Sequence, residues 1–262
     1  MSETGTITLK TAEEIALIRQ ADLIVAGVLD LLRRNIRPGL STMQLDRMAE
    51  EYCRDHGGTP AFKGYYDFPC SLCVSINEEV VHGIPSRKRI LRAGDIVSLD
   101  FGAVFQGFYG NAAITVSVGG TSARKETLMR VTEEALYKGI EQARIGNRVS
   151  DIASAVQTHA EAAGFSVVRQ YVGHGVGTHL HETPEVPNYV DSRSKSSPRL
   201  QEGMVIAIEP MINMGTHQVK VLDNGWTVVT ADRLPSAHFE HSVAITANGP
   251  YILSQLGGAS GS

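Results

Sequence analysis

Cysteine is scarce in this sequence. Only three of the 262 residues are cysteines, namely Cys53, Cys70 and Cys73. So small and odd a number does not suit a disulfide framework. The Cys70-x-x-Cys73 pair has no second pair of soft ligands at a compatible spacing, which a structural zinc site would need. We therefore expect free thiols in a reducing compartment, with a zinc or redox role of the pair as the less favoured alternative.

The sequence also lacks long apolar segments and an excess of charge of one sign. No apolar run approaches the length that spans a bilayer, and the N-terminal stretch MSETGTITLKTAEE has no apolar signal core. The 24 basic and 28 acidic residues give a formal net charge of −4, so neither nucleic acid nor a membrane is expected as the main partner. We expect a cytoplasmic protein, and its 42% hydrophobic content is ample for a core.

Several common catalytic motifs are absent as well. The sequence contains no G-x-S-x-G elbow, no H-E-x-x-H helix and no Walker phosphate-binding loop. The glycine cluster GHGVG at 173–177 precedes no clear helix, so a dinucleotide site is not expected. The chemistry of this chain must therefore be sought in other residues.

Helical periodicity is present in two pairs of segments. Residues 11–36 open with a T-x-x-E capping box, and residues 43–56 follow as a second helix with Ser41 or Thr42 as its cap. A comparable pair is predicted at 122–146 and 150–164. The repetition of the pair suggests an internal duplication.

Short motifs support this duplication. The motif R-x-G at 37–39 recurs at 144–146, and LRAGDIVSLD at 91–100 matches LQEGMVIAIE at 200–209. Both matches occur in the same order, which indicates a repeated unit of two helices followed by strands. Chance similarity between amphipathic helices is the alternative explanation.

The length fits one large domain or two small ones, and we expect a single α+β domain, residues 1–262, built from the two repeated units. Its halves would cover about 11–118 and 122–250, with a short flexible tail at 257–262. Each half ends in buried strands, so four helices would cover a sheet with pseudo-twofold symmetry. Polar side chains that point inward from these strands would meet near the axis.

Five polar residues occupy such inward positions. Asp100 ends the apolar run DIVSLD, and Glu209 ends the apolar run MVIAIE. Glu240 stands at the start of the predicted strand FEHSVAIT, and Asn111 lies in the predicted strand GNAAITV. His174 is flanked by glycines. An ionised carboxylate on a buried strand is costly unless it is paired or bound to a cation. Three carboxylates, an imidazole and an amide suit a divalent metal. For each residue alone, a salt bridge or a cap is the alternative.

Five motifs in order carry a family resemblance. The sequence resembles the type I methionine aminopeptidases of peptidase family M24, from about residue 8 to about 254. This resemblance implies the pita-bread fold, with pseudo-twofold helix-helix-strand units around a curved, mostly antiparallel sheet. The motifs are VHGIP (81–85), LDFG (99–102), GHGVGTHLHE (173–182), IEPM (208–211) and FEHS (239–242).

The resemblance also implies a function. Members of the family remove the initiator methionine from nascent proteins by means of water activated by divalent metal. It further implies a monomer in the cytoplasm, substrates that begin with methionine followed by a small residue, transient ribosome contact, and no direct nucleic-acid function. A proline-directed relative usually carries a further N-terminal domain, for which this chain has no room, and the type II subclass carries a helical insertion that does not fit between Glu209 and Glu240.

The metal ligands follow from the resemblance position by position. Two divalent ions are implied, with cobalt, manganese, iron(II), zinc or nickel as candidates and one or two ions per chain. Asp100 would chelate one ion, His174 and Glu209 would bind the other, and Glu240 would bridge both. Asn111 stands where the family normally has a bridging aspartate.

The catalytic and substrate-binding residues are implied in the same way. His82 and His181 match two histidines that contact the substrate, and Glu209 joins them in catalysis. As alternatives, His82 would be a turn residue, His181 a loop cap, and the pocket residues ordinary core, above all Cys73 and Leu180. The implied methionine pocket consists of Phe62, Tyr65, Phe68, Cys73, Leu180 and Trp226.

Asn111 predicts an impaired enzyme. An aspartate offers two anionic oxygens, whereas an asparagine offers one neutral carbonyl oxygen beside an N–H donor. We expect reduced metal affinity and turnover, and we expect the Asn111→Asp variant to restore both. The alternative function is a catalytically inactive pita-bread protein that binds peptides or a partner.

Overall fold

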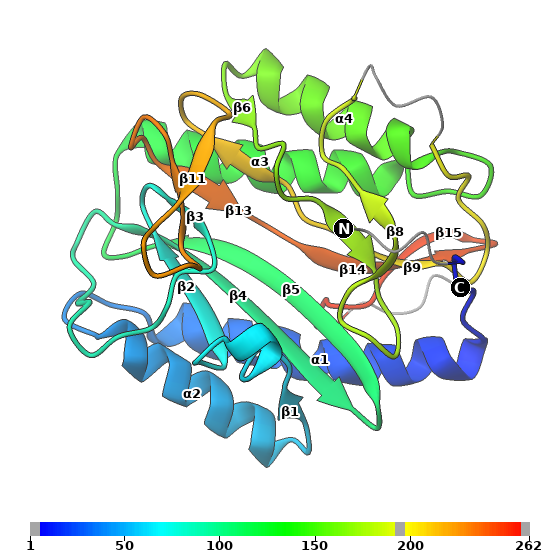
Figure 1. The fold of residues 1–262 in the computed structure, drawn as a ribbon, viewed down its shortest axis with the longest axis horizontal. Coiled ribbons are helices and arrows are strands. Elements are labelled where there is room, and N and C mark those ends of the chain that lie inside the picture. The colour runs from blue at the N-terminus through cyan, green and yellow to red at the C-terminus, as the bar shows by residue number, and fades with distance from the viewer. Residues whose placement is uncertain (1–5, 192–196, 258–262) are drawn as a thin grey trace.

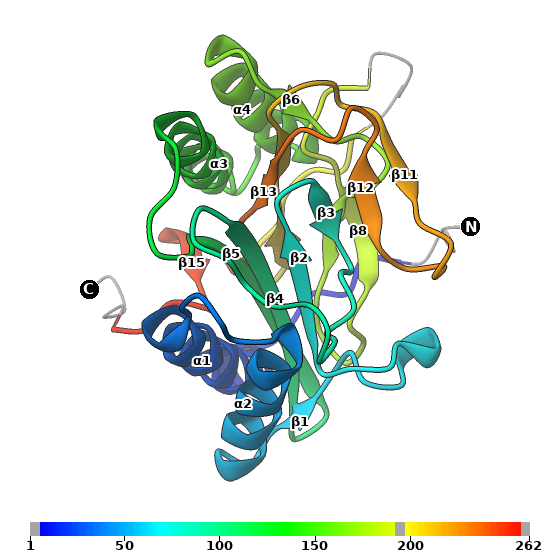
Figure 2. The same ribbon diagram turned by 90° about the vertical axis from the view of Figure 1, so that its left-hand side faces the viewer.

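A computed structural model describes residues 6–191 and 197–257. Of the predicted flexible tail at 257–262, all but the first residue lies outside the described part. Figure 1 shows one pair of helices on one side of the strands and a second pair on the opposite side. Figure 2, turned by 90°, shows the strands β4 and β5 running beside the first pair.

The first half contains two helices followed by strands, as predicted. Helix α1 opens with the expected capping box, in which Glu14 N donates to Thr11 Oγ1 at 3.2 Å and Thr11 N donates to Glu14 Oε2 at 2.8 Å. The elements are α1 (Ala12–Asn35), α2 (Thr42–Asp55), β1 (Thr59–Pro60), the 3-10 helix Tyr65–Asp67, β2 (Leu72–Ile76), β3 (Glu79–Val81), β4 (Ile96–Phe105) and β5 (Phe108–Ser117).

The second half repeats the order of two helices and then strands, but most of its strands are short. The elements of this half are α3 (Ala123–Glu141), α4 (Val149–Ala162), β6 (Ser166–Val167), β7 (Gly173–Gly175), β8 (Glu182–Val186), β9 (Val205–Ile208), β10 (Met211–Asn213), β11 (Val219–Val221), β12 (Val228–Thr230), β13 (Ser236–His238), β14 (His241–Thr246) and β15 (Gly249–Ile252).

The strands form four antiparallel sheets. In the first, β4 pairs with β5 over its whole length and also with β2 and with β1, and in the largest the order is β15-β14-β9-β7-β8. Two three-stranded sheets, β13-β10-β6 and β11-β12-β3, complete the set. Because β3 comes from the first half and β12 from the second, the halves share a sheet.

The two halves also meet between β5 and β14. Ala113 in β5 forms an isolated antiparallel bridge with Glu240, whose backbone N–H donates to Ala113 O at 2.9 Å. Next to it, Ser242 Oγ donates to Asn111 O at 2.9 Å. The strands β5 and β14 therefore meet directly.

Each half has its own apolar core. Helices α1 and α2 bury residues such as Leu32 and Leu45 against β2, β4 and β5, and the second half buries residues such as Ile152 and Val243 around β9 and β14. Ile114 in β5 packs against both cores. Among the described residues, no helix has the length and apolar character needed to cross a membrane.

The three cysteines are free and buried. Burial raises the pKa of Cys53 and of Cys70 to about 11, and it raises the pKa of Cys73 well above its ordinary value. Thiols with such pKa values remain protonated and react poorly. The free state of all three agrees with the expectation of free thiols.

Candidate metal centre and peptide pocket

A cavity of about 290 Å³ lies between the two halves, and every site residue predicted from the sequence lines it. Five further residues that the sequence did not single out line it as well. The predicted residues are Phe62, Tyr65, Phe68, Cys73, His82, Asp100, Asn111, His174, Leu180, His181, Glu209, Trp226 and Glu240, and the additional ones are Tyr66, Val81, Tyr171, Val172 and Met211.

The hairpin of β4 and β5 places two of the polar residues on one face. Asp100 pairs with Ala113, and Gly102 pairs with Asn111 in the same ladder. Residues two apart on a strand share a face, so Asp100 and Asn111 are diagonal neighbours on the side that faces the cavity. The local register therefore explains why these two side chains meet.

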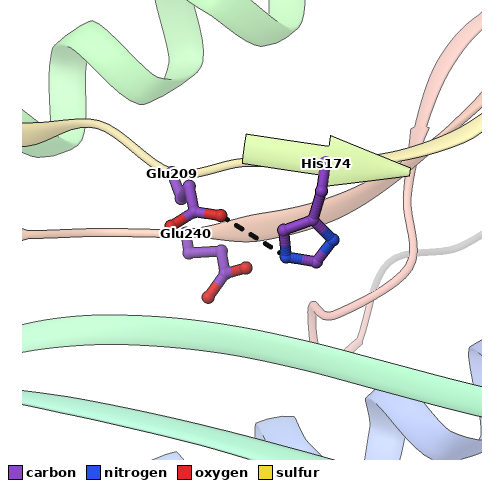
Figure 3. Close-up of side chains that lie close together, drawn as sticks. All are labelled: His174, Glu209 and Glu240. Carbon is purple, nitrogen blue, oxygen red and sulfur yellow. Dashed lines mark ion pairs between the residues drawn. The ribbon is translucent and has the colours of Figure 1, made fainter. Parts of the chain in front are cut away.

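The second half supplies the other three side chains. His174 lies in β7, Glu209 follows the last residue of β9, and Glu240 precedes the first residue of β14. Each of them offers one ligand atom within 4.8 Å of the other two, and His174 Nε2 is 3.5 Å from Glu209 Oε1. Figure 3 shows the three side chains pointing toward one another from separate segments.

Burial and mutual repulsion shape the electrostatics of these groups. Burial raises the pKa of Asp100 to about 7. Burial, and then the nearby Asp100, raises the pKa of Glu209 well above its ordinary value. Burial, followed by Glu209, Asp100 and Asp22, does the same for Glu240. A cation among these carboxyl groups would compensate both the lost hydration and the repulsion.

The residues present fit a divalent cation. Asp100 Oδ1 and Asn111 Oδ1 are buried oxygens without a hydrogen-bond partner among the described residues. Nδ1 of His174 lies 2.9 Å from the Gly175 carbonyl oxygen, which can only accept, and burial lowers the pKa of His174 to about 3. The ring is therefore neutral with its free lone pair on Nε2, which is the form that binds a metal.

Asn111 uses its amide within the site. Its Nδ2 donates to Glu240 Oε1. This donor takes up an oxygen of Glu240 that a cation would otherwise use. Only Asn111 Oδ1, a neutral oxygen, is left for a ligand.

The rest of the cavity is mainly apolar and aromatic. Phe68 meets Trp226 edge to face at 5.1 Å between ring centroids, and Cys73 is only 5% exposed beside them. The predicted pocket residues thus line the same cavity as the metal-binding side chains. An unbranched thioether side chain would suit such walls.

The two predicted substrate histidines stand at the border between pocket and polar cluster. Tyr65 Oη is 2.8 Å from His181 Nδ1, and the rings of His181 and His174 lie 4.3 Å apart. His82 follows β3 directly, adopts a positive φ of 59° and lines the cavity. Burial lowers the pKa of His82 to about 4 and also lowers that of His181, so both rings are neutral near pH 7.

Sequence reasoning missed several residues around the site. Met211 follows Glu209 within the IEPM motif, and Tyr171, which meets the His82 ring edge to face at 5.6 Å, precedes the GHG motif. Both adjacencies were signals that could have found them. His238, two residues before Glu240, is buried beside Glu209, since its Nε2 is 3.8 Å from Glu209 Oε2.

The fold and the site together define a metal-dependent peptidase of the pita-bread type. The family model for "Metallopeptidase family M24" matches residues 16–247. A methionine aminopeptidase from Clostridium perfringens is 53% identical, over 95% of this chain and 99% of the relative, and methionine aminopeptidase 1 of Bacillus subtilis is 49% identical, over 95% and 100%.

Solved structures agree with this classification. The methionine aminopeptidase of Thermotoga maritima has a TM-score of 0.91 and 44% identity, covering 95% of this chain and 100% of its own. The chain therefore belongs to the type I methionine aminopeptidases of metallopeptidase family M24. The prolidase of Pyrococcus furiosus, 24% identical with a TM-score of 0.75, shares the fold, and the chain covers 65% of it.

Proposed function

We propose that this chain is a methionine aminopeptidase that uses a divalent metal to remove the initiator methionine from nascent proteins. The observation that carries the proposal is one cavity in which His174, Glu209 and Glu240 converge beside the aromatic wall of Phe68 and Trp226. A metal-binding cluster and an apolar pocket in contact are what cleavage after a methionine requires. The alternative of an inactive binding protein finds no support among the relatives.

The ligands that we propose are Asp100, His174, Glu209 and Glu240, with Asn111 as a weak carbonyl ligand. When bound, the metal acidifies a water molecule, polarises the scissile carbonyl and anchors the free amine of the substrate. Manganese, cobalt, iron(II), zinc and nickel all suit this mixture of carboxylate and imidazole donors.

The protein's own groups do the remaining work. The carboxylate of Glu209, whose pKa burial raises well above its usual range, can accept the proton of the attacking water. His82 and His181 are neutral, so each offers one N–H donor to the substrate backbone. The Tyr65 hydroxyl contacts Nδ1 of His181 and so leaves Nε2 for the substrate.

The methionine side chain would occupy the apolar part of the cavity. Phe62, Phe68, Cys73, Leu180 and Trp226 line it and exclude water from the thioether. Their aromatic rings give a shaped wall, and the flexible methionine side chain can adapt to it. Side chains with a charge would lose hydration without gaining a partner.

The cellular setting follows the same proposal. The substrates are N-termini that begin with methionine followed by a small residue, met as the nascent chain leaves the ribosome during a transient contact. We place the enzyme in the cytoplasm as a monomeric, single-domain protein with neither membrane association nor a direct nucleic-acid function.

The test is the release of free methionine from a Met-Ala-Ser peptide. Metal-stripped protein is titrated with manganese, cobalt or iron(II), beside a Glu209→Gln variant and a Lys-Ala-Ser peptide as controls. We expect release that requires the cation, the Glu209 carboxylate and the methionine. Absence of release by the native chain and by the Asn111→Asp variant, at any cation concentration, would refute the proposal and favour a binding protein.

A further inference from the structure

His238 is a buried histidine that the mechanism above does not use. It ends β13, is 1% exposed and is not part of the cavity wall. Both of its ring nitrogens are buried without a hydrogen-bond partner among the described residues. A buried donor left without a partner costs about 1–3 kcal/mol, so the position of this ring requires an explanation.

The nearest acceptor of known distance is a proposed metal ligand. His238 Nε2 is 3.8 Å from Glu209 Oε2, while His174 Nε2 is 3.5 Å from Glu209 Oε1. The carboxylate of Glu209 therefore lies between two imidazoles, one facing each oxygen. His174 belongs to the group of side chains that could hold a cation, whereas His238 does not.

The backbone holds His238 in this place. Its N–H donates to Thr115 Oγ1 at 2.9 Å, and Thr115 Oγ1 donates to His238 O at 2.8 Å. His238 also pairs with Met211 in the β13–β10 ladder, and β10 begins two residues after Glu209. Sheet register thus fixes the separation between the ring and the carboxylate.

The ring is chemically suited to donate to that carboxylate. A neutral imidazole carries one N–H, and an Nε2–H tautomer directs it at Glu209. Hydrogen bonds to ligating carboxylates orient them toward the metal.

We propose that His238 is a positioning residue that donates an Nε2–H bond to Glu209 Oε2 and so turns Oε1 toward the cation. This role rests on the proposed metal site. The competing explanation is that the ring only fills space next to Met211.

A pair of substitutions separates the two explanations. His238→Gln keeps an N–H donor but loses the ring, whereas His238→Phe keeps a ring of similar size but has no donor. The readout is the Mn²⁺ affinity of metal-stripped protein by calorimetry, with Tm recorded for each variant. We expect His238→Phe to weaken Mn²⁺ binding by about 10–100-fold and His238→Gln to stay within a few fold of the native chain.

His241→Phe is the matched control. His241 is half-buried, and its ring contacts Ser254 Oγ at 2.8 Å and Tyr137, outside the cavity. It should leave Mn²⁺ affinity unchanged. If His238→Phe fails to fold, His238→Met supplies a flexible apolar replacement without a donor, and the same loss of affinity is expected.

The outcomes are distinguishable. Normal Mn²⁺ affinity in the Phe or Met variant, or a greater loss with Gln than with Phe, would overturn the role of His238 and leave the metal site intact. A native protein and an Asn111→Asp variant that both bind no Mn²⁺ would instead overturn the proposed function, and the role of His238 with it.

Discussion

Neutral aromatic and imidazole side chains hold one another in place within the cavity. Tyr65 Oη lies 2.8 Å from His181 Nδ1, and burial raises the pKa of Tyr65 to about 12, so the phenol stays protonated. The orientation of His181 thus depends on one hydroxyl group.

The Tyr65→Phe variant should therefore lose catalytic efficiency. A net hydrogen bond is worth about 1 kcal/mol, so kcat/KM for Met-Ala-Ser should fall about fivefold to tenfold, mainly through kcat. The control is Tyr137→Phe, which makes the same change outside the cavity, where Tyr137 contacts His241. Equal kcat/KM values for Tyr65→Phe and the native chain would contradict the role of this hydroxyl.

Sequence reasoning located side chains that end or enter apolar strands, but it missed buried polar groups elsewhere. Asp100, Glu209 and Glu240 were recognisable because an acid beside an apolar run is unusual. Asp22, in contrast, lies in an amphipathic helix, where an acid is normally exposed. It is 0% exposed, and neither carboxyl oxygen has a hydrogen-bond partner among the described residues. Helical periodicity cannot reveal that the face of α1 that carries Asp22 is also buried.

Among the elements, α2 supports the segment that carries part of the pocket. Glu50 in α2 accepts from Lys63 Nζ at 2.9 Å and from Ser71 Oγ at 2.8 Å. Lys63 lies directly after Phe62, and Ser71 lies three residues after Phe68, so these bonds tie the pocket segment to α2. The bonds from Lys63, and further bonds from Arg54 and Ser71, lower the pKa of Glu50 to about 2 against the effect of burial.

This lowered pKa predicts a pH-dependent contribution to stability. The unfolded-state pKa of a glutamate is about 4.3, so the folded state stabilises the carboxylate above that pH and loses this stabilisation as the pH falls toward 2. Glu50→Gln should lower the free energy of unfolding at pH 7, and by clearly less at pH 3. Urea denaturation at both pH values measures the loss of unfolding free energy in Glu50→Gln. An equal loss at pH 7 and pH 3 would exclude the ion pair as its cause.

Strand β5 and helix α1 are in direct contact through a glycine. A Cβ atom at Gly110 would lie 2.6 Å from the backbone nitrogen of Asp22, closer than real Cβ contacts. Gly110→Ala must therefore push the helix and strand apart, and overpacking of this kind costs about 1–3 kcal/mol. Urea denaturation should show this loss, and a free energy of unfolding within 0.5 kcal/mol of native, on the scale of neutral substitutions, would contradict the contact.

Three of the four helices were predictable to within a few residues, whereas α3 ends five residues before the predicted 146, and the short strands were not predictable. The segment 11–36 became Ala12–Asn35 and the segment 150–164 became Val149–Ala162. Strands of two or three residues such as β6 and β7 leave no periodicity to detect. Their existence depends on pairing with distant segments, as β3 with β12.

On the scale of the whole molecule, the site belongs to both halves. Asp100 and Asn111 come from the first half, and His174, Glu209 and Glu240 come from the second. The duplicated sequence predicted this meeting, but it did not predict that β3 and β12 would share a sheet. A cation in the cavity would link the halves directly.

Cation binding should accordingly raise thermal stability. A ligand that binds only the folded state adds about 2.7 kcal/mol at one hundred times its Kd, so excess Mn²⁺ should raise the Tm of the metal-stripped protein measurably. The shift should disappear in Glu240→Ala, which removes one proposed ligand. An equal Tm shift in native and variant proteins would place the binding elsewhere.

The most direct test of the account is the number and affinity of Mn²⁺ ions bound by the metal-stripped native chain and by Asn111→Asp, measured by calorimetry. The account predicts one ion per native chain, and a second ion with tighter binding overall in Asn111→Asp, because a carboxylate replaces the Asn111 amide that now donates to Glu240. The same stoichiometry and affinity in both proteins, or no binding in either, would contradict it.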